Sequence, residues 1–149
     1  MRIRYFLSVI VFFLASQSNA QTVLENNPPS LKWFQVATPN FRVLYPEGFD
    51  HEAQRIANSL ERVREPGAKT LGSTPRRMTF ILQNQSSISN GFVSILPRRS
   101  EFYAMPTQDY NFTGTNDWLE MLTVHEYRHV VQYQHATRGF NRAIYYLFG

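Results

Sequence analysis

The sequence contains no cysteine among its 149 residues. A disulfide scaffold, an iron–sulfur cluster, a thiolate zinc site and a cysteine nucleophile are therefore excluded. Any metal ion in this chain has to be bound by His, Asp or Glu. Charged residues are also scarce at 17%, whereas hydrophobic residues reach 43% and aromatic residues 15%. Because disordered chains have the opposite balance, this length and composition predict one compact domain.

Acidic residues are missing from the last part of the chain. All 11 of them lie at or before Glu126, and the last 23 positions have none. The net charge of +4 suggests a polyanionic partner at first. Arg2 and Arg4, however, lie in a segment that we expect to be removed, and without these two the 13 basic and 11 acidic residues that remain give +2.

The other arginine clusters are only pairs, Arg76-Arg77 and Arg98-Arg99. We interpret both pairs as solvated surface rather than as a phosphate-binding patch, because a nucleic-acid interface needs basic residues gathered on one face. We therefore expect no nucleic-acid partner.

Residues 1–20 have the pattern of a secretory signal peptide. Two arginines precede an apolar run of about 11 residues, and small residues end the segment as Ser18-Asn19-Ala20. A membrane anchor is the alternative, but a spanning helix needs about 20 apolar residues. We therefore expect cleavage after Ala20, a mature chain that starts at Gln21, and export to the periplasm or the medium without stable membrane insertion.

The mature chain divides into a polar lead-in over residues 21–30 and one domain over residues 31–149. Alternation and β-branched residues predict strands over 41–45, 78–82, 92–96 and 101–105, with a polar loop over 83–91. Helical periodicity predicts a helix from Asp50, as N-cap, to about residue 68, with a break or kink at Pro66-Gly67. A second helix is expected from Asp117 to about residue 134. This order predicts an α+β domain with a small mixed or antiparallel sheet.

The second helix contains the sequence His125-Glu126-Tyr127-Arg128-His129, which is an HExxH motif. Residues four apart lie on one face of a helix, so the two imidazoles can bind one metal ion. Glu126 then needs no place among the ligands and can accept a proton from a water molecule held there. Nitrogen ligands favour zinc over magnesium or calcium. The alternative is that His125 and His129 form a pair that binds no metal. His51, at the start of the first predicted helix, is interpreted as a surface or capping residue.

The sequence resembles the HExxH zinc metallopeptidases, the zincins, and more narrowly the gluzincin or peptidase-MA-like domains of exported bacterial proteins. The resemblance runs through residues 40–46, 53–60, 89–92, 116–119 and 124–132. It implies a zincin-like N-terminal subdomain, in which a helix packs on a short sheet and a long helix carries HExxH. It also implies that an edge strand, either 92–96 or 101–105, binds an extended peptide substrate. In several exported relatives such a domain precedes a β-propeller, which is a candidate C-terminal domain of the full-length protein.

By the same resemblance His125 and His129 are zinc ligands and Glu126 is the general base of a zinc-dependent peptidase. A gluzincin takes its third ligand from a later Glu, and no acidic residue follows Glu126. The metzincin pattern makes His135 the candidate for that third ligand. Gln132, however, stands where that pattern has a chain-turning Gly, so the helix is expected to continue and to carry His135 away from the metal.

Two explanations for the missing ligand stay open. In the first, the chain is the N-terminal part of a longer enzyme, and residues 144–148 begin a further buried element. In the second, the domain is a degenerate zincin, a catalytically inactive binding module of a larger exported or periplasmic protein. We expect the first.

Overall fold

The computed structural model describes residues 27–95, 97–107, 109, 114, 116–137, 139, 142–143 and 147. The expected signal peptide, most of the lead-in and most of the run 144–148 lie outside these residues. Within them, no helix is both long enough and apolar enough to cross a lipid bilayer.

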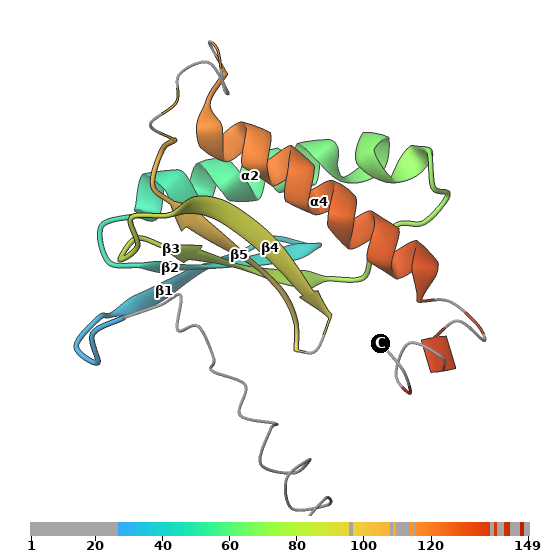
Figure 1. Ribbon diagram of the computed structural model, residues 1–149, viewed down its shortest axis with the longest axis horizontal. Helices are drawn as coiled ribbons and strands as arrows, with labels where there is room; N and C mark the ends of the chain where they lie inside the picture. The colour runs from blue at the N-terminus through green and yellow to red at the C-terminus, as the bar shows by residue number, and fades with distance from the viewer. Residues whose placement is uncertain are drawn as a thin grey trace, which may run out of the picture.

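Five strands form one mixed sheet in the order β1-β2-β3-β5-β4 (Figure 1). The strands are β1 (Trp33–Ala37), β2 (Phe41–Pro46), β3 (Met78–Gln83), β4 (Ser89–Ile95) and β5 (Arg98–Ala104). The three central strands β2, β3 and β5 run parallel, and β1 and β4 are antiparallel to their neighbours. The expected α+β class, with a mixed sheet, is confirmed.

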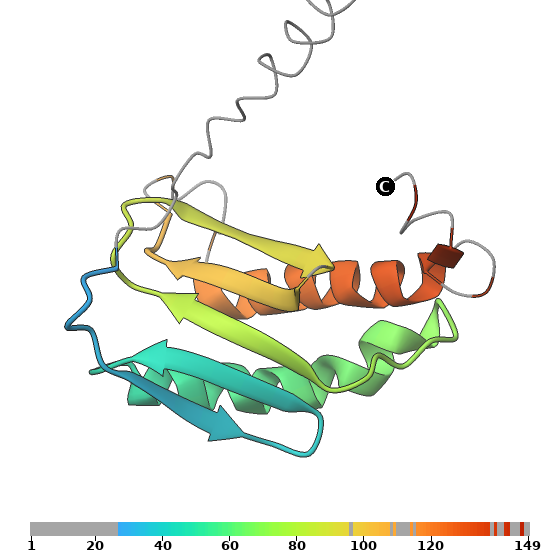
Figure 2. The ribbon, with the colours of Figure 1, turned by 90° about the horizontal axis from the view of Figure 1, so that it is seen from below.

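Two long helices, α2 (Asp50–Lys69) and α4 (Trp118–Ala136), cover the same face of this sheet (Figures 1 and 2). Helix α2 packs on β1 and β2, and α4 packs on β4 and β5. The crossover from β2 through α2 to β3 joins two parallel strands, as such a connection requires. The result places α4 next to the β4 edge of the sheet.

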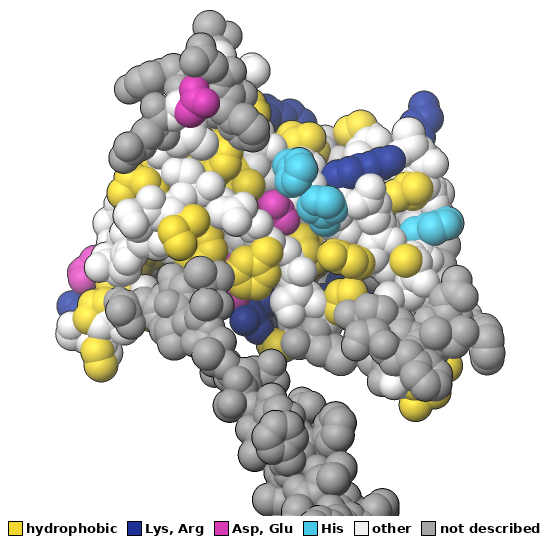
Figure 3. All heavy atoms as spheres, in the orientation of Figure 1, with side chains coloured by type: hydrophobic (Ala, Val, Ile, Leu, Met, Phe, Trp, Pro, Cys, Tyr) yellow, Lys and Arg dark blue, Asp and Glu magenta, His cyan; other side chains and the backbone are white. Residues whose placement is uncertain are grey.

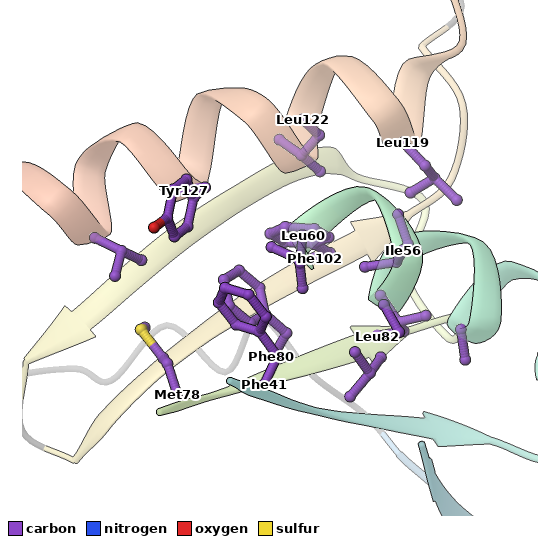
Figure 4. Packing of buried hydrophobic residues seen from close by; sticks show 14 of the residues in the cluster. Phe41, Ile56, Leu60, Met78, Phe80, Leu82, Phe102, Leu119, Leu122 and Tyr127 are labelled. Carbon is purple, nitrogen blue, oxygen red and sulfur yellow. The ribbon is translucent and has the colours of Figure 1, made fainter. Parts of the chain in front are cut away.

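The core lies between the sheet and the two helices (Figure 4). Alternate residues of β3 and β5, such as Phe80 and Phe102, point toward the helices, and their rings meet edge to face at a centroid distance of 5.4 Å. Leu60 from α2 and Leu122 from α4 close the same cluster. Burial of one side chain of this size contributes about 1.5–3 kcal/mol, so the core fixes α4 against the sheet.

Three local expectations are wrong. Helix α2 begins at Asp50 itself, with Phe49 at the cap position and no side-chain cap. It also continues through Pro66 and Gly67 to its end at Lys69, so the helix does not break there. Side chains of α4 donate hydrogen bonds to the carbonyl groups of Arg64 and Gly67 in this stretch. The polar loop is also shorter than expected, because β4 already begins at Ser89.

Candidate metal-binding site on helix α4

Helix α4 carries all three residues of the predicted site. The Asp117 carboxylate caps its N-terminus by accepting a hydrogen bond from the Glu120 amide, at 3.0 Å. The helix then continues without interruption to Ala136. The expected helix is thus confirmed, and His125 and His129 lie one turn apart on its surface.

The two histidine side chains converge on one point. Their Nε2 atoms are 3.1 Å apart, and their rings stand nearly perpendicular, with centroids 4.7 Å apart. His129 Nδ1 lies 2.9 Å from the amide oxygen of Gln132. That oxygen can accept a hydrogen bond from the Nδ1–H tautomer of His129, in which the lone pair lies on Nε2. Figure 3 shows two adjacent histidine side chains over α4 with an acidic side chain beside them.

Glu126 lies below this pair and is buried, with 3% of its surface exposed. Its Oε2 atom has no hydrogen-bond partner among the described residues. Burial raises the pKa of the Glu126 carboxyl group, and the charges of His129 and His125 oppose that rise. An ionisable group that is buried, unpartnered and next to two histidines is typical of a functional site rather than of a packing position.

Strand β4 approaches α4 closely at Gly91. A β-carbon at this position would lie 3.0 Å from Leu122 Cδ1 and 3.1 Å from Glu126 Cγ. Glycine therefore allows the strand to lie against the turn of α4 that carries Glu126. No role for Gly91 follows from the sequence, because Gly91 there ends the predicted polar loop and only the structure places it inside a strand.

A hollow of about 380 Å³ opens between β4 and α4 at this point. We call it the histidine hollow, because His125, Glu126 and His129 line it. Its other walls are largely apolar or aromatic, apart from an asparagine and the glycine: Asn90, Gly91, Phe92, Val93, Trp118, Met121, Leu122 and Tyr133. Polar groups that converge inside a largely apolar concavity are typical of a small-molecule or peptide site.

The two residues between the motif positions hold α4 against α2. The Tyr127 hydroxyl donates to the carbonyl group of Arg64 at 2.9 Å. Arg128 donates to the carbonyl group of Gly67 at 2.8 Å and to the hydroxyl group of Thr70. These bonds fix the rotation of α4 about its axis and so fix the direction of the histidine pair. The sequence showed the two residues but not their partners, which lie about 60 positions earlier.

The other two histidines lie elsewhere. His135 is exposed in the last turn of α4, and it does not line the histidine hollow. His51 is exposed at the start of α2, 3.8 Å from Glu52. Throughout the described residues no group of three His, Cys, Asp or Glu side chains could hold a metal ion. The described donor set therefore consists of two imidazole nitrogens and a nearby carboxylate.

The structure decides between the two expected edge strands. Strand β5 lies between β3 and β4, so residues 101–105 cannot form an edge. Strand β4 is the last strand of the sheet, and its outer side faces no other strand among the residues that the structure describes. Sequence proximity alone could not separate the two, because strand order depends on the parallel β3–β5 pairing.

The interpretation of Arg98-Arg99 as solvated surface is wrong. Arg98 is half-buried and donates to the carbonyl groups of Arg76 and Arg77. Arg99 forms an ion pair with Glu101, which is only 2% exposed.

The histidine hollow thus combines two imidazoles, a buried carboxylate and an adjacent edge strand in one place. Comparison of the chain with protein-family models, with curated proteins and with solved structures gave no match.

Proposed function

We propose that this chain is an exported zinc-dependent peptidase domain, in which His125 and His129 bind the zinc ion and Glu126 is the general base. The observation that carries the proposal is the 3.1 Å separation of the two Nε2 atoms beside the buried carboxylate. Two nitrogens bound to one zinc ion at 2.0–2.1 Å lie about 3.3 Å apart at a tetrahedral angle. The histidine pair fits that requirement with little movement.

Bound zinc would polarise the scissile carbonyl group and lower the pKa of water toward neutrality. Gln132 supports the role of His129, since its amide oxygen favours the tautomer with the proton on Nδ1, in which Nε2 is the ligand atom. Further ligands come from outside the described donor set.

Glu126 is suited to take a proton from the attacking water. Its pKa is raised by burial, and a base is most effective when its pKa lies near the working pH. Its Oε2 atom is free to accept a hydrogen bond, because no side chain or backbone group that the structure describes occupies it. Gly91 keeps the carboxylate accessible, because a side chain at this position would displace it.

Strand β4 supports a peptide or protein as the substrate. Its unpaired side offers backbone N–H and C=O groups that an extended peptide can pair with, and its Gly91–Val93 segment lines the histidine hollow. A peptide added there as a further strand would pass directly over the histidine pair.

One observation favours a second candidate, an inactive zincin-like binding module of a larger exported protein. The described side chains include no group of three metal ligands. Such a module would keep the peptide-binding edge of β4 and the fold around α4 but would not hydrolyse its ligand. Activity measured with and without the Glu126 carboxylate separates the two.

The test is Glu126→Gln in the exported full chain, with peptide hydrolysis followed by mass spectrometry and zinc content by plasma emission spectrometry. We expect hydrolysis to fall by about 10²–10⁴-fold, since that is the usual contribution of a general base, while zinc content is unchanged. Glu65→Gln removes an exposed carboxylate from α2 and is the matched control, with activity unchanged. Equal hydrolysis by Glu126→Gln and the unmodified chain would contradict the proposal.

A further inference from the structure

A second hollow, of about 260 Å³, lies beyond the histidine hollow toward the C-terminal end of α4. We call it the arginine hollow, because Arg76, Arg98 and Arg142 line it. Arg76 precedes β3, Arg98 begins β5, and Gln134 contributes from α4. Residues far apart in the sequence thus bring three guanidinium groups to one concavity.

None of the described residues that line the arginine hollow is acidic. Arg98 is the half-buried member, and its hydrogen-bond acceptors are neutral: the carbonyl oxygens of Arg76 and Arg77 at 3.2 Å and the amide oxygen of Gln134 at 3.3 Å. No carboxylate pairs with Arg98 among the residues that the structure describes. Burial and the charge of Arg76 lower the pKa of Arg98. The positive charge of the Arg98 guanidinium group is therefore unfavourable in the hollow, and a bound anion would stabilise it.

The two hollows are adjacent along β4 and α4. Val93 and Tyr133 line both of them, and β4 runs along both, from Gly91 beside Glu126 to Ile95 beside the arginines. Four residues of a strand span about 13 Å. A peptide paired with β4 and centred on the histidine pair would therefore place its residue about four positions away in the arginine hollow.

We propose that the arginine hollow is a specificity subsite that binds a carboxylate of the peptide substrate, about four residues from the bond that is cleaved. This inference rests on the proposed function, because it assumes a peptide substrate bound along β4. Guanidinium groups bind carboxylates through paired, charge-assisted hydrogen bonds, which favour a peptide acid over its uncharged amide analogue. The substrates are then peptides with an acidic residue, or with a free C-terminus, at that distance.

The experiment uses a peptide set in which one Glu is moved through the four positions on each side of the scissile bond, with Gln at the same position as reference. Binding to the full-length Glu126→Gln variant is measured by fluorescence anisotropy, and cleavage by the unmodified chain is measured in parallel. We expect the Glu peptide with the correct spacing to bind about tenfold more tightly than its Gln partner. The preference should shrink in 0.5 M salt.

Three variants locate the preference. Arg76→Gln changes an exposed side chain and Arg98→Gln a half-buried one, and both should reduce the Glu-over-Gln ratio to near one while thermal unfolding shows a folded protein. If Arg98→Gln unfolds, the Glu-over-Gln ratio of Arg76→Gln alone shows whether the arginine hollow causes the preference. Arg42→Gln removes an exposed arginine on β2 and is the matched control, with the ratio unchanged. Peptides with free and amidated C-termini distinguish a terminal carboxylate from a side-chain carboxylate.

The outcomes separate this inference from the proposed function. Tight, arginine-dependent binding of Glu peptides without cleavage would support the subsite and contradict the peptidase. Cleavage with equal rates for Glu and Gln peptides at every position would overturn the subsite alone. A Glu preference that survives both Arg76→Gln and Arg98→Gln would also overturn it.

Discussion

At the scale of single residues, the Glu126 carboxylate opposes folding. It is buried, its Oε2 atom has no partner among the described groups, and burial raises its pKa. The stability of the fold favours an uncharged side chain at this buried position. A general base, in contrast, has to be able to carry a negative charge. The position is therefore one where stability and the proposed activity make opposite demands.

This conflict predicts that Glu126→Gln stabilises the zinc-free protein. We expect the free energy of unfolding at pH 7 to rise by about 1 kcal/mol, because the variant no longer buries a charge. The folded chain holds the Glu126 proton to a higher pH than the unfolded chain, in which the carboxyl group has its ordinary pKa of about 4.5. Stability of the unmodified protein should therefore fall as the pH rises above that value, and this slope should be reduced in the variant.

Urea unfolding between pH 4 and pH 8, with chelator present, measures both quantities. Glu65→Gln serves as the control, because that carboxylate is exposed and makes no described ion pair. A variant that is less stable than the unmodified protein, with the same dependence on pH, would show that the carboxylate is a structural group.

The sequence predicted the histidine pair and Glu126 because their relation is local, within one helical turn. It did not predict what surrounds them. Gly91 approaches Glu126 from a strand about 35 positions earlier, and Arg98 meets Arg76 through the pairing of β3 with β5. Such contacts depend on the topology of the sheet, and no periodicity in the sequence carries that information.

At the scale of elements, two different kinds of contact join α2 to α4. Arg62 pairs with Glu120 at 3.0 Å on the surface, where the two side chains are 66% and 40% exposed. Arg128 instead donates into the C-terminal end of α2, at the Gly67 carbonyl and the Thr70 hydroxyl. A cation at a helix C-terminus also interacts favourably with the helix dipole.

We expect Arg128→Gln to lower the free energy of unfolding by about 1–2 kcal/mol, because hydrogen bonds of a charged group to helix-terminal acceptors are lost. Arg62→Gln, the matched control on the same pair of helices, should cost at most about 1 kcal/mol, since exposed ion pairs contribute little. Urea denaturation of both variants gives the comparison. Equal costs for the two variants would mean that Arg128 does not hold the helix carrying the site.

Most elements were predictable because their periodicities are distinct. The alternation in Phe41–Pro46 and Met78–Gln83 and the helical stripe of α2 each survive in the structure. The exceptions involve tertiary contacts rather than local pattern. Side chains of α4 bond to carbonyl groups of α2 around Pro66, and β4 begins early because Ser89 and Asn90 pair with β5.

At the scale of the whole molecule, export is a prediction from residues 1–20, which lie outside the described residues. We expect the exported protein to begin at Gln21, since the small residues at Ser18 and Ala20 match the requirement of signal peptidase. Mass spectrometry of the N-terminal peptide from the periplasm or the medium identifies the first residue. A mature protein that still begins at Met1 would contradict cleavage.

If His125 and His129 together bind one zinc ion, the zinc content of the purified protein has to depend on both histidines. The full exported chain should be purified without chelators and analysed by plasma emission spectrometry, together with His125→Ala, His129→Ala and the control His135→Ala. We predict about one zinc ion per chain in the unmodified protein and in His135→Ala, and loss of zinc from the other two variants. A metal-free unmodified chain, or zinc retained after loss of either His125 or His129, would show that the histidine pair is not a zinc site.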